Sequence, residues 1–254
     1  MIPLREQEYI RQRFEQEMDG RVKIDYFTQK ASSLIIPGRE ECTYCEETGQ
    51  MLAELASLSE KLSVTVHDFA QERDEAAKCG IDRVPGIVLR GPANRPLRFF
   101  GIPGGNEFPN FVETIIDASK QQTKVAAEAA KQLKKLKEKA TITVYVTPTC
   151  PHCPGVVRAA FRLALASSHI EATAVEIGEF PQLAQQLGVR AVPFTVFNGQ
   201  ASVAGAMDEA GLVEATLKAV EGGKLGGTSG QGGATTQAGA PPEGPPGSGL
   251  VLPR

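Results

Sequence analysis

The sequence lacks the features that would place the chain on a nucleic acid or in a membrane. It has 27 lysines and arginines against 30 aspartates and glutamates, so there is no basic excess or stripe to bind nucleic acid. No apolar run approaches the ~18 residues of a membrane-spanning helix. The N-terminus has no basic segment followed by an apolar stretch, as a secretory signal would. These absences predict a cytoplasmic protein without nucleic-acid or membrane partners.

Cysteine and histidine are also scarce, and each scarcity excludes a class of protein. Five cysteines in 254 residues are too few for a disulfide-stapled scaffold, and their number is odd. The three histidines lie in no recognisable hydrolase motif, so an acid–base triad is not supported. What the chain does contain is 41% apolar residues, enough for a packed core, and four cysteines arranged as two close pairs. In a cytosolic chain such pairs indicate redox or metal chemistry.

The two cysteine pairs lie in an internal repeat. Cys42 begins the first Cys-x-x-Cys motif and stands 43 positions before Pro85. Cys150 begins the second motif and stands 43 positions before Pro193. Each proline follows a valine, and a glycine lies five positions before each proline. Several landmarks at a common offset of 108 residues predict a duplication.

Each half of the repeat predicts the same order of elements. Alternating apolar and polar residues predict strands, and apolar residues at 3.6-residue spacing predict helices. The order is helix, strand, helix, strand, helix, a two-stranded hairpin and a closing helix, predicted at residues 5–18, 22–27, 45–62, 64–69, 72–79, 86–89, 97–101 and 108–119, then again at 125–136, 142–146, 154–166, 170–177, 181–187, 194–197, 202–205 and 209–220. A parallel crossover followed by a hairpin gives an α/β fold with a mixed sheet between helices.

This pattern divides the chain into three parts. Residues 1–119 form the first unit, residues 120–221 the second, and residues 222–254 a tail. The tail is mostly Gly, Pro, Ser, Thr, Ala and Gln, so it cannot bury enough apolar surface to offset its ordering entropy, and we predict that it is disordered. The first unit carries about ten extra residues within Gln29–Glu41.

The motif Cys150-Pro151-His152-Cys153 follows a strand and a short turn and opens a helix. The free N–H groups and positive dipole end of a helix favour a thiolate, so we expect the pKa of Cys150 to lie below the ~8.5 of a free thiol. Pro151 fits the first helical turn, and protonated His152 adds positive charge beside the sulfur. Cys153, about one turn further in, would resolve a mixed disulfide on Cys150.

A zinc site is the other interpretation of two Cys-x-x-Cys pairs. Paired zinc motifs are usually separated by on the order of 15–20 residues. Here more than a hundred residues separate the pairs, with one pair in each repeat. We therefore favour redox chemistry and expect neither a metal nor another cofactor.

Val84-Pro85 and Val192-Pro193 each come just before a predicted strand. Either proline alone would simply start a strand, but the shared spacing to a cysteine pair favours a functional role. At these residues the sequence resembles the thioredoxin superfamily, in which a cis proline faces the Cys-x-x-Cys motif. The resemblance implies that the backbones of Val84 and Val192 pair with a bound substrate peptide and that the two proline rings shield the disulfides.

With its duplication, the chain resembles the glutaredoxin-like protein disulfide oxidoreductases, which fuse two thioredoxin-fold units. The resemblance covers roughly residues 3–221 and rests on Cys42-Thr43-Tyr44-Cys45, on the second cysteine motif and on the matched segments 80–85 and 188–193. It implies reduction, oxidation or isomerisation of protein disulfides by two thioredoxin-like units in tandem. It also implies a thioredoxin-reductase-type flavoprotein as electron donor, with catalytic residues Cys42, Cys45, Cys150 and Cys153.

The two sites are not expected to be equally reactive. Nearby carboxylates raise a cysteine pKa, and the first motif is flanked by Glu40, Glu41, Glu46 and Glu47, with only Arg39 as a close cation. Cys150 has no adjacent acid, and Arg158 and Arg162 follow on its helix. We therefore predict that Cys150 is the more reactive nucleophile.

Other interpretations stay open at this point. The chain is alternatively a dedicated electron carrier to a peroxidase, or a non-catalytic peptide-binding or holdase module, although intact cysteines at both sites favour an enzyme. Cys79 is interpreted as a buried structural thiol, and His67 and His169 as surface residues. Asp68 and Glu176 either assist proton transfer near the sulfurs or are solvated strand-end carboxylates.

Overall fold

The computed structural model describes residues 2–29 and 41–222. The predicted tail and most of the predicted insertion at Gln29–Glu41 lie outside these residues. The predicted helices and strands all occur, in the predicted order: α1 Leu4–Glu17, β1 Val22–Thr28, α2 Cys45–Ala56, β2 Leu62–Asp68, α3 Arg73–Cys79, β3 Gly86–Arg90, β4 Leu97–Phe100, α4 Glu107–Ala118, α5 Ala127–Leu133, β5 Ala140–Val146, α6 Cys153–Ala166, β6 Ile170–Glu176, α7 Pro181–Leu187, β7 Phe194–Phe197, β8 Ala201–Ala204 and α8 Glu209–Val220. A short 3₁₀ turn, η1, at Ile177–Glu179 was not predicted.

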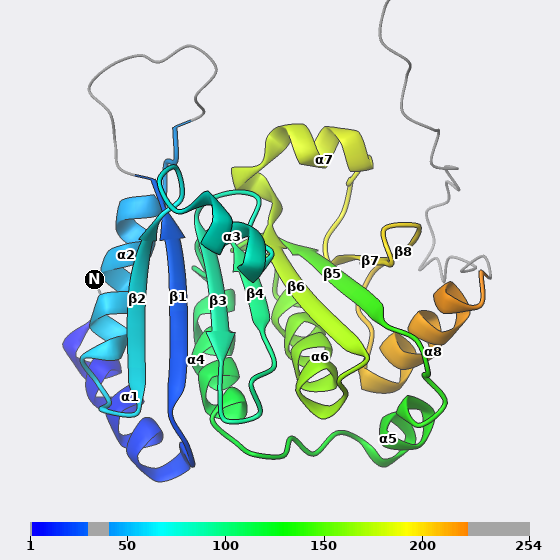
Figure 1. The fold of residues 1–254 in the computed structure, drawn as a ribbon, viewed down its shortest axis with the longest axis horizontal. Helices are drawn as coiled ribbons and strands as arrows, with labels where there is room; N and C mark the ends of the chain where they lie inside the picture. The colour runs from blue at the N-terminus through cyan, green and yellow to red at the C-terminus, as the bar shows by residue number, and fades with distance from the viewer. Residues whose placement is uncertain (1, 30–40, 223–254) are drawn as a thin grey trace, which may run out of the picture.

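All eight strands form one mixed sheet in the order β2-β1-β3-β4-β6-β5-β7-β8 (Figure 1). Strands β3 and β7 run antiparallel to their neighbours, and the other strands are mutually parallel. Each unit contributes four neighbouring strands, and the halves join where β4 pairs in parallel with β6. This pairing satisfies two strand edges that would otherwise present unpaired backbone groups.

The two faces of the sheet carry different cores. Helices α2, α4, α6 and α8 pack on the face away from the viewer in Figure 1, whereas the short helices α3 and α7 lie on the near face. Successive side chains of a strand point to opposite faces, so Ile24 and Tyr26 of β1 enter the larger core and Phe27 enters the smaller one. The near face is therefore less completely covered by helices.

The helices α3 and α7 show both the repeat and its limits. Each ends at a glycine in the left-handed conformation, Gly80 with φ +71° and Gly188 with φ +63°, a backbone geometry that glycine adopts without a steric penalty. Helix α3 buries Ala76 and Cys79, but α7 has no buried residue. The near-face helix is thus packed tightly against the sheet in the first unit and loosely in the second.

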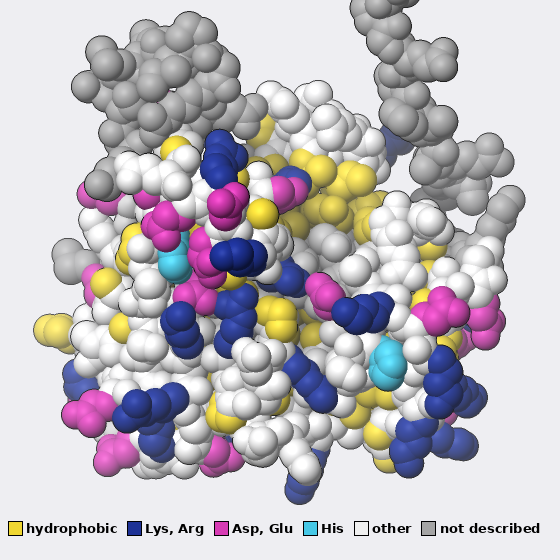
Figure 2. All heavy atoms as spheres, in the orientation of Figure 1, with side chains coloured by type: hydrophobic (Ala, Val, Ile, Leu, Met, Phe, Trp, Pro, Cys, Tyr) yellow, Lys and Arg dark blue, Asp and Glu magenta, His cyan; other side chains and the backbone are white. Residues whose placement is uncertain are grey.

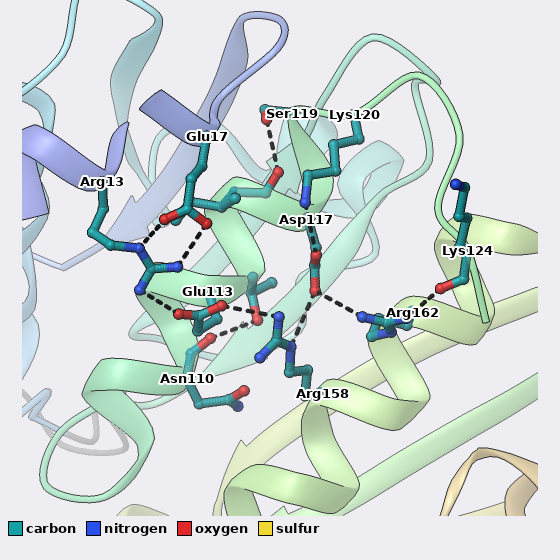
Figure 3. A network of polar contacts seen from close by, with 12 residues as sticks. Arg13, Glu17, Asn110, Glu113, Asp117, Ser119, Lys120, Lys124, Arg158 and Arg162 are labelled. Carbon is teal, nitrogen blue, oxygen red and sulfur yellow. Dashed lines mark hydrogen bonds and ion pairs between the residues drawn. The ribbon is translucent and has the colours of Figure 1, made fainter. Parts of the chain in front are cut away.

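The units are also joined by an ion-pair network on the helical face (Figure 3). Arg158 of α6 binds Glu113 at 2.9 Å and Asp117 at 3.1 Å, both on α4. Arg13 of α1 binds Glu113 at 2.6 Å. The Asp117 side chain is only 6% exposed, so its charge is compensated within the protein.

The largest boundary difference from the prediction lies between α2 and β2. Helix α2 ends at Ala56 and β2 begins at Leu62, whereas the pattern predicted a helix to residue 62 and a strand from residue 64. Serines end the helix early, because the hydroxyl of Ser57 donates to the Glu54 carbonyl and that of Ser59 accepts from the Lys61 N–H. Leu58 is buried in the turn itself, which explains why the apolar pattern continued past the helix. In the described part of the chain, no helix is long and apolar enough to cross a membrane.

Candidate functional site

Both cysteine motifs lie at the same edge of the sheet. The first follows β1 and opens α2, and the second follows β5 and opens α6. Because β1 and β5 run in the same direction within one sheet, their carboxyl ends meet the same edge. The topology therefore places both motifs along the upper edge of Figure 1, with β3, β4 and β6 between the strands that precede them.

Each motif forms a disulfide. Cys42 is bonded to Cys45 and Cys150 to Cys153, with 5.5 Å between the Cα atoms in both pairs. The second cysteine is the first residue of its helix and is sheltered, with Cys45 4% and Cys153 0% exposed. Cys42 is half-buried and Cys150 is 8% exposed. In each pair the first cysteine is thus the more exposed residue.

The helix beginnings differ in charge. The N–H of Cys153 lies 3.2 Å from the sulfur of Cys150, a contact that favours a thiolate there on reduction. The first turn of α6 has no acidic residue, whereas the first turn of α2 carries Glu46 and Glu47. Glu41 is exposed beside Cys42, but Arg39 and Glu40 lie outside the described residues. The local charges therefore still favour a thiolate at Cys150 over one at Cys42.

Two expectations about the second site were wrong. Pro151 precedes the helix, because α6 begins at Cys153, and Pro154 occupies the first turn instead, with exposed His152 as the N-cap residue. Arg158 and Arg162 do not support the Cys150 thiolate. Figure 3 shows both directed at Asp117, and Arg162 also binds Glu209 at 2.8 Å. Sequence distance along the helix could not reveal these partners.

The two Val-Pro pairs lie at the same edge as the cysteines. Both peptide bonds, Val84–Pro85 and Val192–Pro193, are cis, as the resemblance implied. The residue after each proline pairs with the next-to-last residue of β1 or β5. Each proline carbonyl accepts a 2.8 Å hydrogen bond from a glycine that follows the hairpin, Gly101 or Gly205. The predicted substrate-binding residues therefore sit beside the strand ends from which the cysteine motifs continue.

An apolar surface extends between the two cis-proline turns. Val84 and Val192 are half-buried and pack on the smaller core together with Phe180, Leu183 and Phe194. Figure 2 shows hydrophobic side chains gathered beneath α7 on this face. A partly uncovered apolar surface beside the two cis-proline turns suits contact with another polypeptide.

Sequence reasoning missed a buried carboxylate near the second site. Glu107 is 1% exposed; Asn110 donates to its Oε2 at 3.0 Å, and its Oε1 has no hydrogen-bond partner among the described residues. Burial raises the pKa of Glu107 to about 7. The N–H of the preceding Asn106 donates to the carbonyl of Pro148 at 2.9 Å, in the turn that leads to Cys150. An acid in the first turn of a helix is ordinary, so nothing in the sequence marked it.

The two carboxylates considered for proton transfer, Glu176 and Asp68, both accept backbone hydrogen bonds. Glu176 is 5% exposed and accepts hydrogen bonds from the N–H groups of Gly178 and Glu179, so it is not a solvated carboxylate, and burial raises its pKa. Asp68 accepts from the N–H groups of Ala70 and Gln71, which closes a turn.

Two further side chains belong to the first unit's near face. His67 is not a surface residue: its ring stacks on Phe27 at 4.6 Å and bonds Glu72 at 2.7 Å. Cys79 is buried as predicted, with the Arg90 guanidinium 3.3 Å from its sulfur.

Known proteins similar to this chain share its thioredoxin-like fold. The thioredoxin domain family matches residues 140–218. The thioredoxin of Methanocaldococcus jannaschii is 36% identical over 81 residues, which cover 95% of that protein and 32% of this chain. The chain belongs to the thioredoxin superfamily. The family match lies within the second unit, and the first unit repeats the same order of elements.

Longer similarities cover both thioredoxin-like units. The alkyl hydroperoxide reductase AhpF of Pseudomonas putida is 27% identical over 167 residues, 65% of this chain but 30% of that protein. A protein disulfide oxidoreductase from Aeropyrum pernix K1 is 26% identical with a TM-score of 0.75, over 87% of this chain and 95% of that one. The NTD_N/C domain of alkylhydroperoxide reductase AhpF from Enterococcus faecalis is 25% identical with a TM-score of 0.74, over 85% of this chain and 100% of that one. The chain thus has a thioredoxin-like fold with two Cys-x-x-Cys sites, and it spans about 30% of the length of the curated relatives it matches first.

Proposed function

We propose that this protein catalyses dithiol–disulfide exchange with disulfides of other proteins, with reduction as its main direction. The observation that supports this proposal is the pairing, in each unit, of an outer and a sheltered cysteine at a sheet edge that also carries a cis-proline turn. An electron carrier needs only accessible sulfurs. A catalyst of protein disulfides also needs a surface that holds a peptide, and the apolar surface near Val84 and Val192 supports such a role.

The exchange proceeds in two balanced steps. The thiolate of Cys150 attacks one sulfur of a substrate disulfide, so a mixed disulfide forms and the other substrate sulfur leaves as a thiolate. Cys153 then loses its proton and attacks the sulfur of Cys150, which releases the second substrate thiolate and forms the Cys150–Cys153 disulfide. Two electrons pass to the substrate. A thioredoxin-reductase-type flavoprotein is the proposed donor that returns the pair to the dithiol, and Cys42 and Cys45 would follow the same cycle.

The test is the reduction of insulin by dithiothreitol, followed by turbidity, with wild type, Cys42→Ser and Cys150→Ser. We expect wild type to accelerate the reaction and Cys150→Ser to lose more of the activity than Cys42→Ser, because the local charges favour the Cys150 thiolate. No acceleration by the wild type would overturn the proposal. Equal losses, or a greater loss in Cys42→Ser, would overturn the ranking of the sites.

A second candidate function is electron transfer to a peroxidase. It is favoured by the similarity of most of this chain to the complete NTD_N/C domain of the Enterococcus faecalis reductase. In that role the protein would carry electrons from a flavoprotein to an alkyl hydroperoxide reductase partner. The test measures NADPH oxidation with a thioredoxin reductase, a two-cysteine peroxidase and cumene hydroperoxide. Peroxide turnover that depends on this chain, combined with no insulin reduction, would favour the carrier over the general catalyst.

A further inference from the structure

Glu179 belongs to the second unit, but its carboxylate lies against the first. It ends the 3₁₀ turn η1, and its Oε1 accepts a 2.6 Å hydrogen bond from the N–H of Ile102. A Cβ added to Gly101 would lie 2.7 Å from the same oxygen, so the carboxylate rests directly on the backbone of that glycine. Gly101 also has φ +88°, which a larger residue would rarely adopt. The contact therefore depends on a glycine in one unit and an acid in the other.

This contact lies at the cis-proline turn of the first site. The N–H of Gly101 donates to the carbonyl of Pro85 at 2.8 Å, and Pro85 lies beside the end of β1. From β1 itself, the hydroxyl of Tyr26 donates to the carbonyl of Cys45. Glu179 interacts electrostatically with this tyrosine. The acid therefore lies against the segment that closes the proline turn of the first site.

The charged groups that face Glu179 are mostly acidic. Glu176 approaches from β6 and Glu47 from α2, and both raise the pKa of Glu179. Burial is the larger cause, and the hydrogen bond from Ile102 lowers the pKa only in part, so the pKa is raised to about 7. The Arg83 guanidinium lies over the neighbouring Phe180 ring at 5.4 Å and is paired with Asp82 at 2.8 Å. Glu179 therefore changes from neutral to charged near neutral pH.

We infer that Glu179 is a positioning residue of the first site. Its carboxylate comes from the second unit, and once ionised it disfavours the formation of a thiolate in the reduced Cys42–Cys45 pair. This inference rests on the proposed thiol chemistry of the first site. A negative charge near a thiol favours the protonated form. The reactivity of the first site should therefore depend on pH through Glu179 as well as through its own sulfurs. One of the groups that set the reactivity of Cys42 thus belongs to the other unit.

The test measures the alkylation of Cys42 by iodoacetamide in a background where Cys150 and Cys153 are serine. The reduced protein is labelled between about pH 5.5 and pH 8, and the rate is read from peptide masses with and without Glu179→Gln. Glutamine keeps an acceptor for the Ile102 N–H but carries no charge. We expect equal rates at the acidic end, where Glu179 is protonated, and about three- to tenfold faster labelling of the glutamine variant at the basic end, because each pKa unit is worth tenfold in thiolate.

The matched control is Glu171→Gln, which removes a carboxylate of the same unit that pairs with Arg98 at 3.1 Å, away from the first site. It should leave the profile unchanged. A constant ratio of rates across pH for Glu179→Gln, or the same change in the control, would overturn the inference. If the glutamine variant does not fold, the unsubstituted background decides, since its Cys42 profile must contain an additional inflection near pH 7. Alkylation needs no protein substrate, so its outcome is independent of the insulin assay.

Discussion

Single buried carboxylates set much of the pH behaviour expected of this protein. Glu107 and Glu179 both have a pKa raised to about 7, in each case chiefly because burial penalises the charged form. In the unfolded chain a glutamate ionises near pH 4.5, so the folded protein holds these protons over a range where the unfolded chain has released them. Their contribution to stability is complete below about pH 4.5 and is lost as the pH rises through 7. The protein should therefore be less stable at about pH 8 than at about pH 5.

Replacement of Glu107 by glutamine should flatten this dependence. Between about pH 5 and pH 8, wild type should lose about 2–3 kcal/mol more unfolding free energy than Glu107→Gln. The reason is that the raised pKa of Glu107 makes its ionisation less favourable in the folded protein than in the unfolded chain. Urea denaturation of the oxidised protein at both pH values measures the difference. Glu128→Gln, an exposed change in α5, serves as the control and should keep the wild-type dependence. Identical pH dependence in wild type and Glu107→Gln would show that the acid is not neutral in the folded state.

At the scale of secondary-structure elements, the two units have diverged most in their near-face helices. Helices α3 and α7 have the same length and the same left-handed glycine at the end, but only α3 sends buried side chains into the core. The open side of α7 adjoins the apolar surface that includes Val192. The second site thus has a loosely anchored helix beside its proline turn, and the first site has a firmly anchored one.

Amide hydrogen exchange should reveal this difference. The amides of α7 should exchange at least about tenfold faster than those of α3 under native conditions, because few buried contacts oppose local opening of α7. Exchange read by NMR or by mass spectrometry of short peptides measures the two helices in the same sample. Strands β1 and β5 provide internal references that should both be strongly protected. Equal protection of α3 and α7 would contradict the assignment of loose packing.

At the scale of the whole molecule, the two thioredoxin-like units are parts of one structure. The continuous sheet crosses from one unit to the other between β4 and β6, and the helical face is bridged by the ion pairs of α4 and α6. Asp117 is the most buried acid of this bridge and contacts Arg158, Arg162 and Lys120. Its loss leaves several cations without their shared partner.

Asp117→Asn should therefore destabilise the whole protein by about 1–3 kcal/mol, since the change removes a buried carboxylate that Arg158 and Arg162 share. The matched change Glu214→Gln breaks an exposed pair with Lys218 on α8 and should cost much less than Asp117→Asn. Urea denaturation followed by circular dichroism gives both values. Because the units share a sheet, we expect one transition in each variant. Similar small losses for both changes would indicate that the bridge contributes little.

Much of this protein is readable from local sequence information. The cysteine spacing, the Val-Pro pairs and the offset of 108 residues predicted a duplicated α/β chain, because each of these features depends on residues close together or on exact repetition. The helices and strands followed from periodicity for the same reason. Errors were confined to element ends such as the early stop of α2, where serine side chains bond the backbone.

The contacts between the two units became visible only in the tertiary structure. It joined their sheets, directed Arg158 and Arg162 to Asp117 instead of the cysteines, and brought Glu179 to the proline turn of the other unit. These features arise from contacts between residues that are distant along the chain, and periodicity carries no information about such partners. The ionisation of a carboxylate depends on the water that packing removes and on the charges that packing brings near, so the buried acids became visible only once the two units were in place.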